Sequence, residues 1–291
     1  MPSIQSYISD IQVQLEAVYP AAEAKEMAWW IAEETTGLSR SQLLSGCKDT
    51  TIFPNVQTII ERLLHFEPIQ YIFGHTLWCG LDLKVSPATL IPRPETGELV
   101  DTIYNSQFTI YNSQFTIHNC RVLDVGTGSG CIAIALKKRH PEWEVTGVDI
   151  SEEAIEVAKE NAVRNGVEVR FEKMDIFSDE IEGIGTFDIV VSNPPYICEK
   201  EKEGMRRNVL DFEPGTALFV PDEDPLKFYR RIVFSIQHSV FSNHRPCYLF
   251  FEINEAYPQE LKALLEELGY KDIQITQDIY GKDRIIEGRM A

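Results

Sequence analysis

The sequence predicts an α/β fold, with a mostly parallel sheet of seven strands preceded by a small helical domain and a two-stranded connector. Three observations support this. From Cys120 onward, short apolar runs alternate with amphipathic helical segments, as is typical of a parallel sheet. A glycine-rich turn joins the first of these runs to an apolar helix. Before about residue 75, apolar residues recur at helical spacing instead.

The N-terminal part is expected to contain at least two helices. Residues 22–36 carry an apolar stripe, and Gly37 follows where a helix commonly ends. Residues 56–66 repeat the pattern, and residues 4–18 form a third candidate. We therefore expect residues 1–75 to form a helical domain.

Residues 76–92 change to an alternating pattern, which favours strands. Gly80 interrupts the alternation, so a β-hairpin that links two domains is expected. In the segment Pro92–Thr96 that follows, Pro94 disfavours helix at Arg93, and Thr96 can cap the next helix. A helix start leaves Arg93 without an explanation.

Residues 104–117 are a tandem duplication of the heptapeptide Tyr-Asn-Ser-Gln-Phe-Thr-Ile. Two copies are too few for a solenoid, which needs at least three repeats. The duplication lies between a predicted helix and the first strand of the large domain, so we interpret it as an insertion in a surface connection.

The first strand of the large domain, residues 121–125, leads into a glycine-rich turn, Gly126–Gly130, and then into an apolar helix. Glycines at alternate positions let the backbone approach a ligand closely. Asp149 ends the second strand, where an acid holds the ribose of a nucleotide in folds of this kind. It can alternatively cap the following helix, although Ser151 is better placed to do so. Asp124, inside the first strand, can bond the ligand or the amides of the turn.

Further strands and helices complete the sheet. Ser151 and Gly166 bracket a helix over residues 152–165, and another helix is expected from about Asp224 to Phe241. The remaining strands are predicted at residues 169–172, 187–192 and 248–253, with a closing hairpin formed by residues 273–278 and 283–288.

The fourth strand ends in Asn193-Pro194-Pro195-Tyr196, the most informative motif in the chain. Side chains at this end of a strand point into the crevice where α/β sheets bind ligands. The prolines fix φ and remove backbone donors, so the turn is stiff and its carbonyls are free to accept. Asn193 adds an oxygen and Tyr196 a flat face. Such a turn can hold a planar NH₂ group while its nitrogen stays open to attack.

The composition excludes several classes of protein. The net charge of −18, spread over both halves of the chain, argues against tight sequence-independent binding of nucleic acid. The six cysteines form no C-x-x-C pair, so neither a zinc site nor a disulfide framework is expected. No apolar run approaches the roughly 18 residues of a membrane span, and the N-terminus lacks a signal-peptide pattern. We expect a cytoplasmic protein that does not bind membranes.

A dinucleotide fingerprint would need a small residue where Cys131 stands. The G-x-G-x-G form of the turn, after a strand that carries an acid, resembles instead the S-adenosylmethionine loop of class I methyltransferases. The chain as a whole resembles the release factor glutamine methyltransferases of bacteria and organelles. The resemblance rests on these segments: Glu67–Gly74, Leu90–Thr96, Asp124–Gly130, Asn193–Ile197, Phe212–Pro214 and Thr216–Leu218.

The resemblance implies a seven-stranded methyltransferase domain over residues 93–291, a hairpin linker over 76–92 and an N-terminal domain, residues 1–75, that binds the substrate. It implies that S-adenosylmethionine contacts the residues Gly126, Thr127, Gly128, Ser129, Gly130, Asp149, Asp175, Ile176 and Asn193. An aliphatic Ile176 stands beside the expected adenine site, where relatives often have an aromatic residue. Gly97 also departs from the family, in which an acid is usual.

The same resemblance implies that the substrate glutamine binds to Asn193, Pro194, Pro195, Tyr196 and Ile197. Catalysis would rest on Asn193, Pro194 and Tyr196, with no metal. The expected product is methylated at the N5 amide nitrogen of the glutamine in the Gly-Gly-Gln motif of class 1 release factors. A monomer that binds no nucleic acid directly is expected.

Three alternatives remain open at this stage. A ribosomal-protein glutamine methyltransferase shares both motifs. A nucleic-acid amino-methyltransferase uses the same tetrapeptide to grip an exocyclic NH₂, but needs a basic surface or a recognition domain, and neither is visible. A non-catalytic binding module that retains the cofactor is disfavoured by the intact Asn193 turn. The sequence also leaves open whether Arg93 and Glu213 orient the substrate or pair with each other, whereas Glu252 is interpreted as structural.

Overall fold

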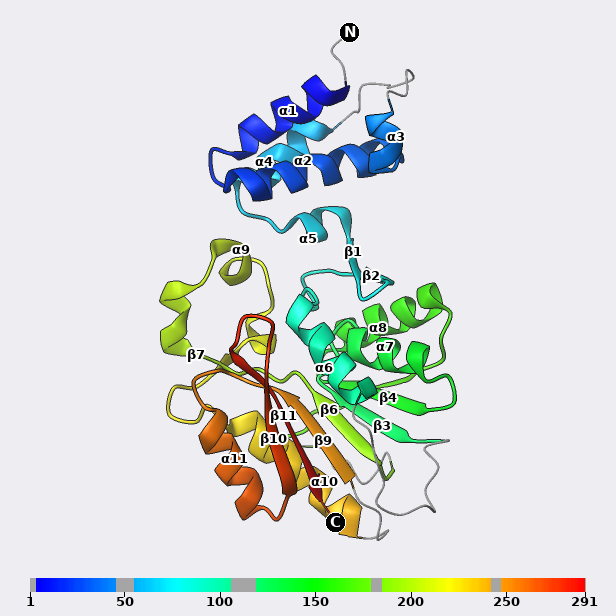
Figure 1. Cartoon of the computed structure of the whole chain (residues 1–291), viewed down its shortest axis with the longest axis vertical. Helices are drawn as coiled ribbons and strands as arrows, with labels where there is room; N and C mark the ends of the chain where they lie inside the picture. Colours follow the sequence, from blue (N-terminus) through cyan, green and yellow to red (C-terminus); the bar gives the residue numbers. More distant parts are fainter. Residues whose placement is uncertain (1–3, 46–54, 106–118, 179–184, 242–246, 291) are drawn as a thin grey trace. The chain divides into compact units, whose positions relative to one another are not determined.

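The computed structural model describes residues 4–45, 55–105, 119–178, 185–241 and 247–290 (Figure 1). The chain divides into two compact units. The first contains residues 1–74 together with Arg206–Phe212, and the second contains residues 75–205 and 213–291. Most of the duplicated heptapeptide, residues 106–117, lies outside the described residues, so its interpretation as a surface insertion stays a prediction.

The first unit is helical, as the sequence predicted. Its helices are α1 (Ile4–Leu15), α2 (Ala21–Thr36), α3 (Arg40–Leu44), α4 (Val56–Leu64) and α5 (Ile69–Phe73). The buried faces form one apolar core, which includes Ile11, Ile31 and Leu63. Gly37 adopts a left-handed conformation with φ of 66° and ends α2 at the predicted position. Helix α1 ends three residues earlier than expected, because the chain turns before Pro20.

A segment from much later in the sequence completes the first unit. Residues 206–212 include the short helix α9 (Arg207–Leu210). Arg206 Nη1 lies 3.1 Å from both carboxylate oxygens of Glu23. The guanidinium of Arg207 lies over the ring of Phe66, 4.6 Å from its centroid. The first unit is therefore built from two separate pieces of sequence.

The second unit begins with the predicted hairpin, whose strands β1 (His75–Trp78) and β2 (Leu81–Lys84) are antiparallel. Contacts group the hairpin with the second unit, and its role as a linker stays a prediction. Asn161 joins the hairpin to the rest of this unit. Its amide exchanges hydrogen bonds of 2.6 and 3.0 Å with the backbone of Lys84 and donates at 2.8 Å to the carbonyl of Ser129 in the glycine-rich turn.

The sheet of the second unit has seven strands in the order β10-β11-β9-β6-β3-β4-β5, and β11 alone runs antiparallel. This confirms the predicted fold class. The strands are β3 (Arg121–Val125), β4 (Glu144–Asp149), β5 (Arg170–Lys173), β6 (Ile189–Ser192), β9 (Cys247–Glu252), β10 (Lys271–Gln277) and β11 (Asp283–Met290). A small parallel pair, β7 (Ile197–Cys198) and β8 (Phe219–Val220), lies apart from it. The predicted bounds differ by one or two residues at several strand ends.

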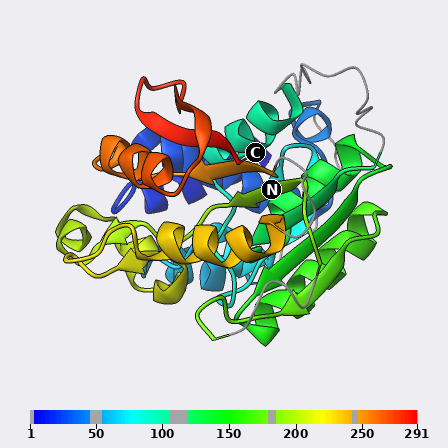
Figure 2. The same ribbon diagram turned by 90° about the horizontal axis from the view of Figure 1, so that it is seen from below.

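Helices cover both faces of this sheet (Figure 1 and Figure 2). One face packs on α6 (Pro94–Asn105), α7 (Cys131–Arg139) and α8 (Glu152–Asn165), through residues such as Leu99, Ile134 and Ile155. The other packs on α10 (Lys227–Phe241) and α11 (Pro258–Glu267), through residues such as Ile232 and Leu265. Because both faces are buried, the central strands are nearly continuous apolar runs.

The predicted capping signals have mixed outcomes. Ser151 Oγ accepts from the amide of Ala154 at 3.1 Å, so Ser151 is the N-cap of α8, as predicted. Thr96 is not an N-cap. Helix α6 already begins at Pro94, and the hydroxyl of Thr96 donates to Glu252 instead.

Gly97, which the sequence analysis noted, is a buried residue of α6. A Cβ at this position would lie 2.8 Å from Cys79 Sγ, so a larger residue here would require the Cys79 side chain to move.

Candidate active site

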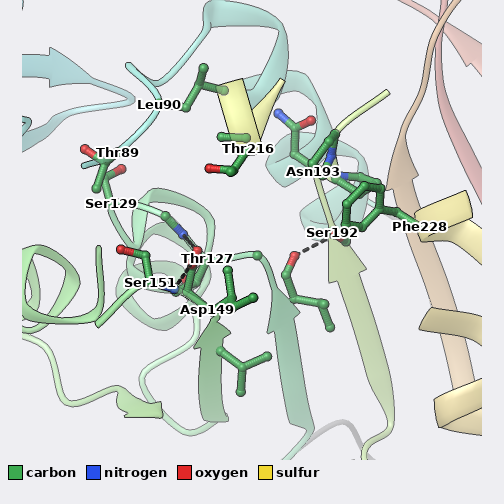
Figure 3. Close-up of a pocket in the computed structure, with 18 of the residues that line it drawn as sticks. Thr89, Leu90, Thr127, Ser129, Asp149, Ser151, Ser192, Asn193, Thr216 and Phe228 are labelled. Atoms are coloured by element: carbon green, nitrogen blue, oxygen red, sulfur yellow. Dashed lines mark hydrogen bonds between the residues drawn. The ribbon is translucent and has the colours of Figure 1, made fainter. Parts of the chain in front are cut away.

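One pocket lies at the carboxyl ends of β3, β4, β5 and β6 (Figure 3). Strand β3 pairs with β4 on one side and with β6 on the other, so the chain changes direction across the sheet at this point. Ligands bind at such switch points in α/β sheets. Predicted site residues that line the pocket are Gly126, Thr127, Gly128, Ser129, Asp149, Asp175, Ile176, Asn193, Pro194 and Pro195.

The glycine-rich turn presents its backbone to this pocket. Gly126 and Gly128 have positive φ, and a Cβ on either would meet no heavy atom closer than 4.0 Å. Space next to the backbone therefore remains for a ligand. Gly130 is different, since it does not line the pocket and its Cβ would crowd Ile134, Ala158 and Phe171 at 3.0 to 3.1 Å. Gly130 is needed for packing under the turn, and its predicted contact with the cofactor stays a prediction.

Asp149 ties this turn to the end of β4. Its Oδ2 accepts from the amide of Gly128, and its Oδ1 accepts from the amide of Ser151, both at 2.9 Å. Burial raises the pKa of Asp149, while these two amides act in the opposite direction. Ser151 is the N-cap of α8, so Asp149 does not have that role. Asp149 lines the pocket instead.

Asp124 lies beneath the same turn and does not line the pocket. Its Oδ2 accepts from Thr127 Oγ1 at 2.6 Å and from the amide of Ala133 at 3.3 Å. Of the two roles left open by the sequence, the structure therefore supports the one in which Asp124 orders the turn. Complete burial raises the pKa of this carboxyl to about 7.

Asp175 and Ile176 line the pocket just beyond β5, and two aromatic residues that the sequence analysis did not assign lie beside them. Phe177 and Phe228 pack edge to face with ring centroids 5.3 Å apart, and both line the pocket. Phe177 directly follows Ile176 and could have been included on that ground. Phe228 belongs to α10, where nothing in the local sequence distinguishes it from a core residue.

The turn after β6 forms another wall. Ser192 Oγ donates to the carbonyl of Val125 at 2.6 Å, which ties this strand end to β3. Asn193, Pro194 and Pro195 line the pocket, and Asn193 Nδ2 donates to Thr96 Oγ1 at 3.1 Å.

Tyr196 and Ile197 are not among the pocket-lining residues. The hydroxyl of Tyr196 donates to Glu252 Oε1 at 2.9 Å, and Asn254 Nδ2 donates to the Tyr196 carbonyl at 3.0 Å. Burial and the neighbouring Glu252 raise the pKa of Tyr196. Contacts of Tyr196 and Ile197 with a substrate stay predictions.

The structure pairs Arg93 with Glu213, one of the alternatives that the sequence left open. Arg93 Nη2 donates to Glu213 Oε1 at 2.6 Å, and the other oxygen accepts from the amide of Ile91 at 3.1 Å. The indole of Trp78 donates to the Arg93 carbonyl at 2.7 Å. The sequence analysis gave no site role to three other residues of the pocket wall, Thr89, Leu90 and Thr216, although the last two lie in segments that carry the family resemblance (Figure 3).

Within the described part of the chain, no group of three or more His, Cys, Asp or Glu residues is arranged to hold a metal ion. In the same part, no helix is both long and apolar enough to cross a membrane.

Comparisons with known proteins agree with this architecture. The model of the methyltransferase small domain matches residues 106–211, and that of the PrmC N-terminal domain matches residues 8–74. A crystal structure of a methyltransferase from Pyrococcus furiosus, 20% identical, shares the fold with a TM-score of 0.50 over 80% of this chain and 98% of that chain.

Two relatives match almost end to end. The release factor glutamine methyltransferase of Bacteroides thetaiotaomicron is 43% identical over 95% of this chain and 96% of its own length. That of Flavobacterium psychrophilum is 38% identical over 98% of both. With such identity over whole chains, and with both domain models matched, the chain belongs to the release factor glutamine methyltransferases and is an S-adenosylmethionine-dependent enzyme.

Proposed function

We propose that the chain methylates release factors on the side-chain amide nitrogen, N5, of a glutamine. The target is the glutamine of the Gly-Gly-Gln motif in class 1 release factors. The observation that carries this proposal is the joining of two motifs in one pocket. The glycine-rich turn and Asp149 form one part of the wall, and Asn193–Pro195 form another.

The pocket fits the cofactor that the family uses. Gly126 and Gly128 leave their backbone open to a ligand, and the carboxylate of Asp149 is suited to ribose hydroxyls. Asp175, Ile176 and the Phe177–Phe228 pair supply polar and apolar surface for the adenine. When bound, S-adenosylmethionine supplies a methyl group activated by a sulfonium.

The residues of the Asn193 turn overcome the poor nucleophilicity of an amide nitrogen, whose lone pair is delocalised into its carbonyl. Asn193 Oδ1 and the Pro194 carbonyl accept the two N–H hydrogens of the glutamine and hold its nitrogen in place. These acceptors become better matched as positive charge grows on that nitrogen during transfer. The stiff proline turn fixes them in advance, so orientation makes a large contribution. The proton leaves after transfer, and no strong base is needed.

We also propose that the enzyme works as a monomer in the cytoplasm and does not bind nucleic acid directly. The net charge of −18 supports the last point, because binding to a phosphate backbone needs a basic face. The release-factor substrate supports the cytoplasm, where translation ends.

A methyl-transfer assay tests the proposal. The purified protein is incubated with labelled S-adenosylmethionine and, in separate reactions, with release factors, ribosomal protein and rRNA. We expect label in the release factors alone, and mass spectrometry of peptides should place it on the Gly-Gly-Gln glutamine. Label confined to ribosomal protein would move the enzyme to the other glutamine-methylating branch. Label in rRNA would overturn the amide assignment, and no transfer at all would indicate a binding module.

A further inference from the structure

A chain of hydrogen bonds runs from the Asn193 turn into the protein interior. Asn193 Nδ2 donates to Thr96 Oγ1 at 3.1 Å, and Thr96 Oγ1 donates to Glu252 Oε2 at 2.7 Å. The other oxygen of Glu252 accepts from the hydroxyl of Tyr196 at 2.9 Å. Both Thr96 and Glu252 are 2% exposed.

The topology brings these groups together from three distant parts of the sequence. Asn193 follows β6, and Glu252 ends β9, which pairs with β6 in parallel so that Ser192 lies opposite Phe251. Thr96 lies in the first turn of α6. The backbone of Glu252 is also fixed, because the hydroxyl of Tyr229 donates to its carbonyl at 3.0 Å.

The chemistry of these groups gives the chain a direction. An ionised carboxylate only accepts hydrogen bonds, and a threonine hydroxyl has a single hydrogen to donate. Since that hydrogen goes to Glu252, the oxygen of Thr96 can only accept from Asn193. The amide of Asn193 is thereby turned so that Nδ2 faces Thr96. No donor among the described residues hydrogen-bonds to Asn193 Oδ1, so this oxygen remains available to a ligand.

The surroundings of Glu252 contain charges of both signs. Burial raises the pKa of Glu252, and the nearby Glu95 acts in the same direction. The hydroxyls of Thr96 and Tyr196 and the guanidinium of Arg284 favour the ionised form. Arg284 is itself held by Asp278, whose Oδ2 lies 3.1 Å from Arg284 Nε. In the structure both Glu252 oxygens act as acceptors, one from Thr96 and one from Tyr196.

We propose that Thr96 and Glu252 are positioning residues that fix which atom of Asn193 faces the substrate. The proposal rests on the proposed function, in which the oxygen of Asn193 must accept from the substrate NH₂. It also gives the Pro-Arg-Pro-Glu-Thr motif, of which Thr96 is the last residue, a role beyond starting a helix. Without the carboxylate, the Thr96 hydroxyl can donate to Asn193 Oδ1, and the amide can then turn its own NH₂ toward the substrate.

A double-mutant cycle separates this role from simple packing. Thr96→Val keeps the shape of the side chain but removes the hydroxyl, and Thr96→Ser restores it. Glu252→Gln replaces one of the two acceptor oxygens with a donor, so the side chain can no longer accept from both Thr96 and Tyr196. Each of these substitutions is made alone, as is Asn193→Ala, and Thr96→Val is also combined with Asn193→Ala. For every variant, methyl transfer to a release factor is measured in single turnover. Cofactor affinity and Tm are measured in parallel.

We expect Thr96→Val and Glu252→Gln to lower the transfer rate by about tenfold or more, with unchanged cofactor affinity and with most activity kept in Thr96→Ser. In the Asn193→Ala background, Thr96→Val should have no further effect, because Thr96 acts through Asn193. Equal losses in both backgrounds would overturn the proposal and leave Thr96 a packing residue. If the wild type is active but the losses are equal in both backgrounds, only the positioning role of Thr96 and Glu252 is refuted. If the wild type itself is inactive, the proposed function is refuted.

A second measurement needs no substrate. In protein labelled with ¹⁵N-asparagine, the side-chain NH₂ signal of Asn193 is identified by its absence in Asn193→Ala. We expect the hydrogen that Asn193 donates to Thr96 to be protected from exchange in the wild type and in Thr96→Ser, and to lose this protection in Thr96→Val. An unprotected signal in the wild type, or one unchanged in Thr96→Val, would overturn the proposal whatever the activity.

Discussion

The guanidinium of Arg93 lies 2.6 Å from a carboxylate oxygen of Glu213, and this contact joins two segments that are 120 residues apart. Both segments line the pocket: Thr89, Leu90, Pro92 and Arg93 belong to one, and Pro214, Thr216 and Ala217 to the other. The Glu213 side chain is fully buried, whereas that of Arg93 is 33% exposed. The pair therefore fixes two parts of the pocket wall relative to each other.

Loss of Arg93 alone should be more harmful than loss of both partners. Arg93→Met leaves the Glu213 carboxylate buried without its cation, and we expect a cost of about 2 kcal/mol in the free energy of unfolding, less than for a fully buried pair because Arg93 is partly exposed. Urea unfolding measures this cost. Adding Glu213→Gln should restore part of the loss, and a double variant less stable than Arg93→Met would contradict the prediction.

Asn193→Ala should lower kcat by about 100-fold or more, because it removes an acceptor that is matched to the transition state. The affinity for S-adenosylmethionine, measured by calorimetry, should change little. Near-normal turnover in this variant would refute the role assigned to Asn193. Asn193→Asp is an informative companion, since it retains an acceptor but carries a charge.

Asp149→Ala should act mainly on cofactor binding. It removes the carboxylate that accepts from the amides of Gly128 and Ser151, so both the turn and the ribose contact are affected. We expect the Kd for S-adenosylmethionine to rise by tenfold or more, equivalent to about 1.4 kcal/mol. Asp149→Asn, which keeps one acceptor oxygen, should lose less. Unchanged affinity in both variants would exclude Asp149 from the cofactor site.

Gly147→Ala should disturb the cofactor site from within β4. The added Cβ would lie 2.7 Å from both Thr127 Oγ1 and Phe171 Cε1, so these two side chains, one of which belongs to the glycine-rich turn, must shift. Overpacking of this kind costs about 1 to 3 kcal/mol and should also weaken cofactor binding. Gly204→Ala is the matched control, because a Cβ there meets nothing within 4 Å. Equal unfolding free energies for the two variants would refute the packing argument.

Asp124 should make stability depend on pH. Its pKa is raised to about 7 in the folded protein by burial, whereas an unfolded chain has a value near 3.9. Between these values the native state binds more protons than the unfolded state, so the contribution of Asp124 to stability falls as pH rises. From about pH 5 to about pH 8, the unfolding free energy of the wild type should therefore fall relative to that of Asp124→Asn. A difference independent of pH would show that Asp124 does not titrate in this range.

The sequence predicts most of the fold because its signals are local. The apolar runs of β3, β4 and β6 and the capping residues Ser151 and Gly166 lie within the elements that they define. Pocket residues that follow a strand end, such as Asn193 and Asp149, could be found in the same way.

Most contacts between distant segments could not be predicted, although the pairing of Arg93 with Glu213 was one of the alternatives that the sequence offered. Thr96 has the residue type of an N-cap, and its actual partner, Glu252, is 156 residues away. Phe228 has the ordinary apolar character of a helix face, and only the folding of α10 against the sheet brings it to the pocket. Tyr196 lies one residue beyond the pocket-lining part of its motif, because its hydroxyl is held by Glu252.

The helical unit also includes residues 206–212, and this affects the design of fragments of the protein. A fragment that starts at His75 would still encode Arg206 and Arg207 but would lack Glu23 and Phe66, their partners. Conversely, a fragment that stops at Gly74 would be missing part of its own surface. The residues of the helical unit are thus divided between the two fragments, so domain swaps between relatives should exchange residues 1–74 and 206–212 together.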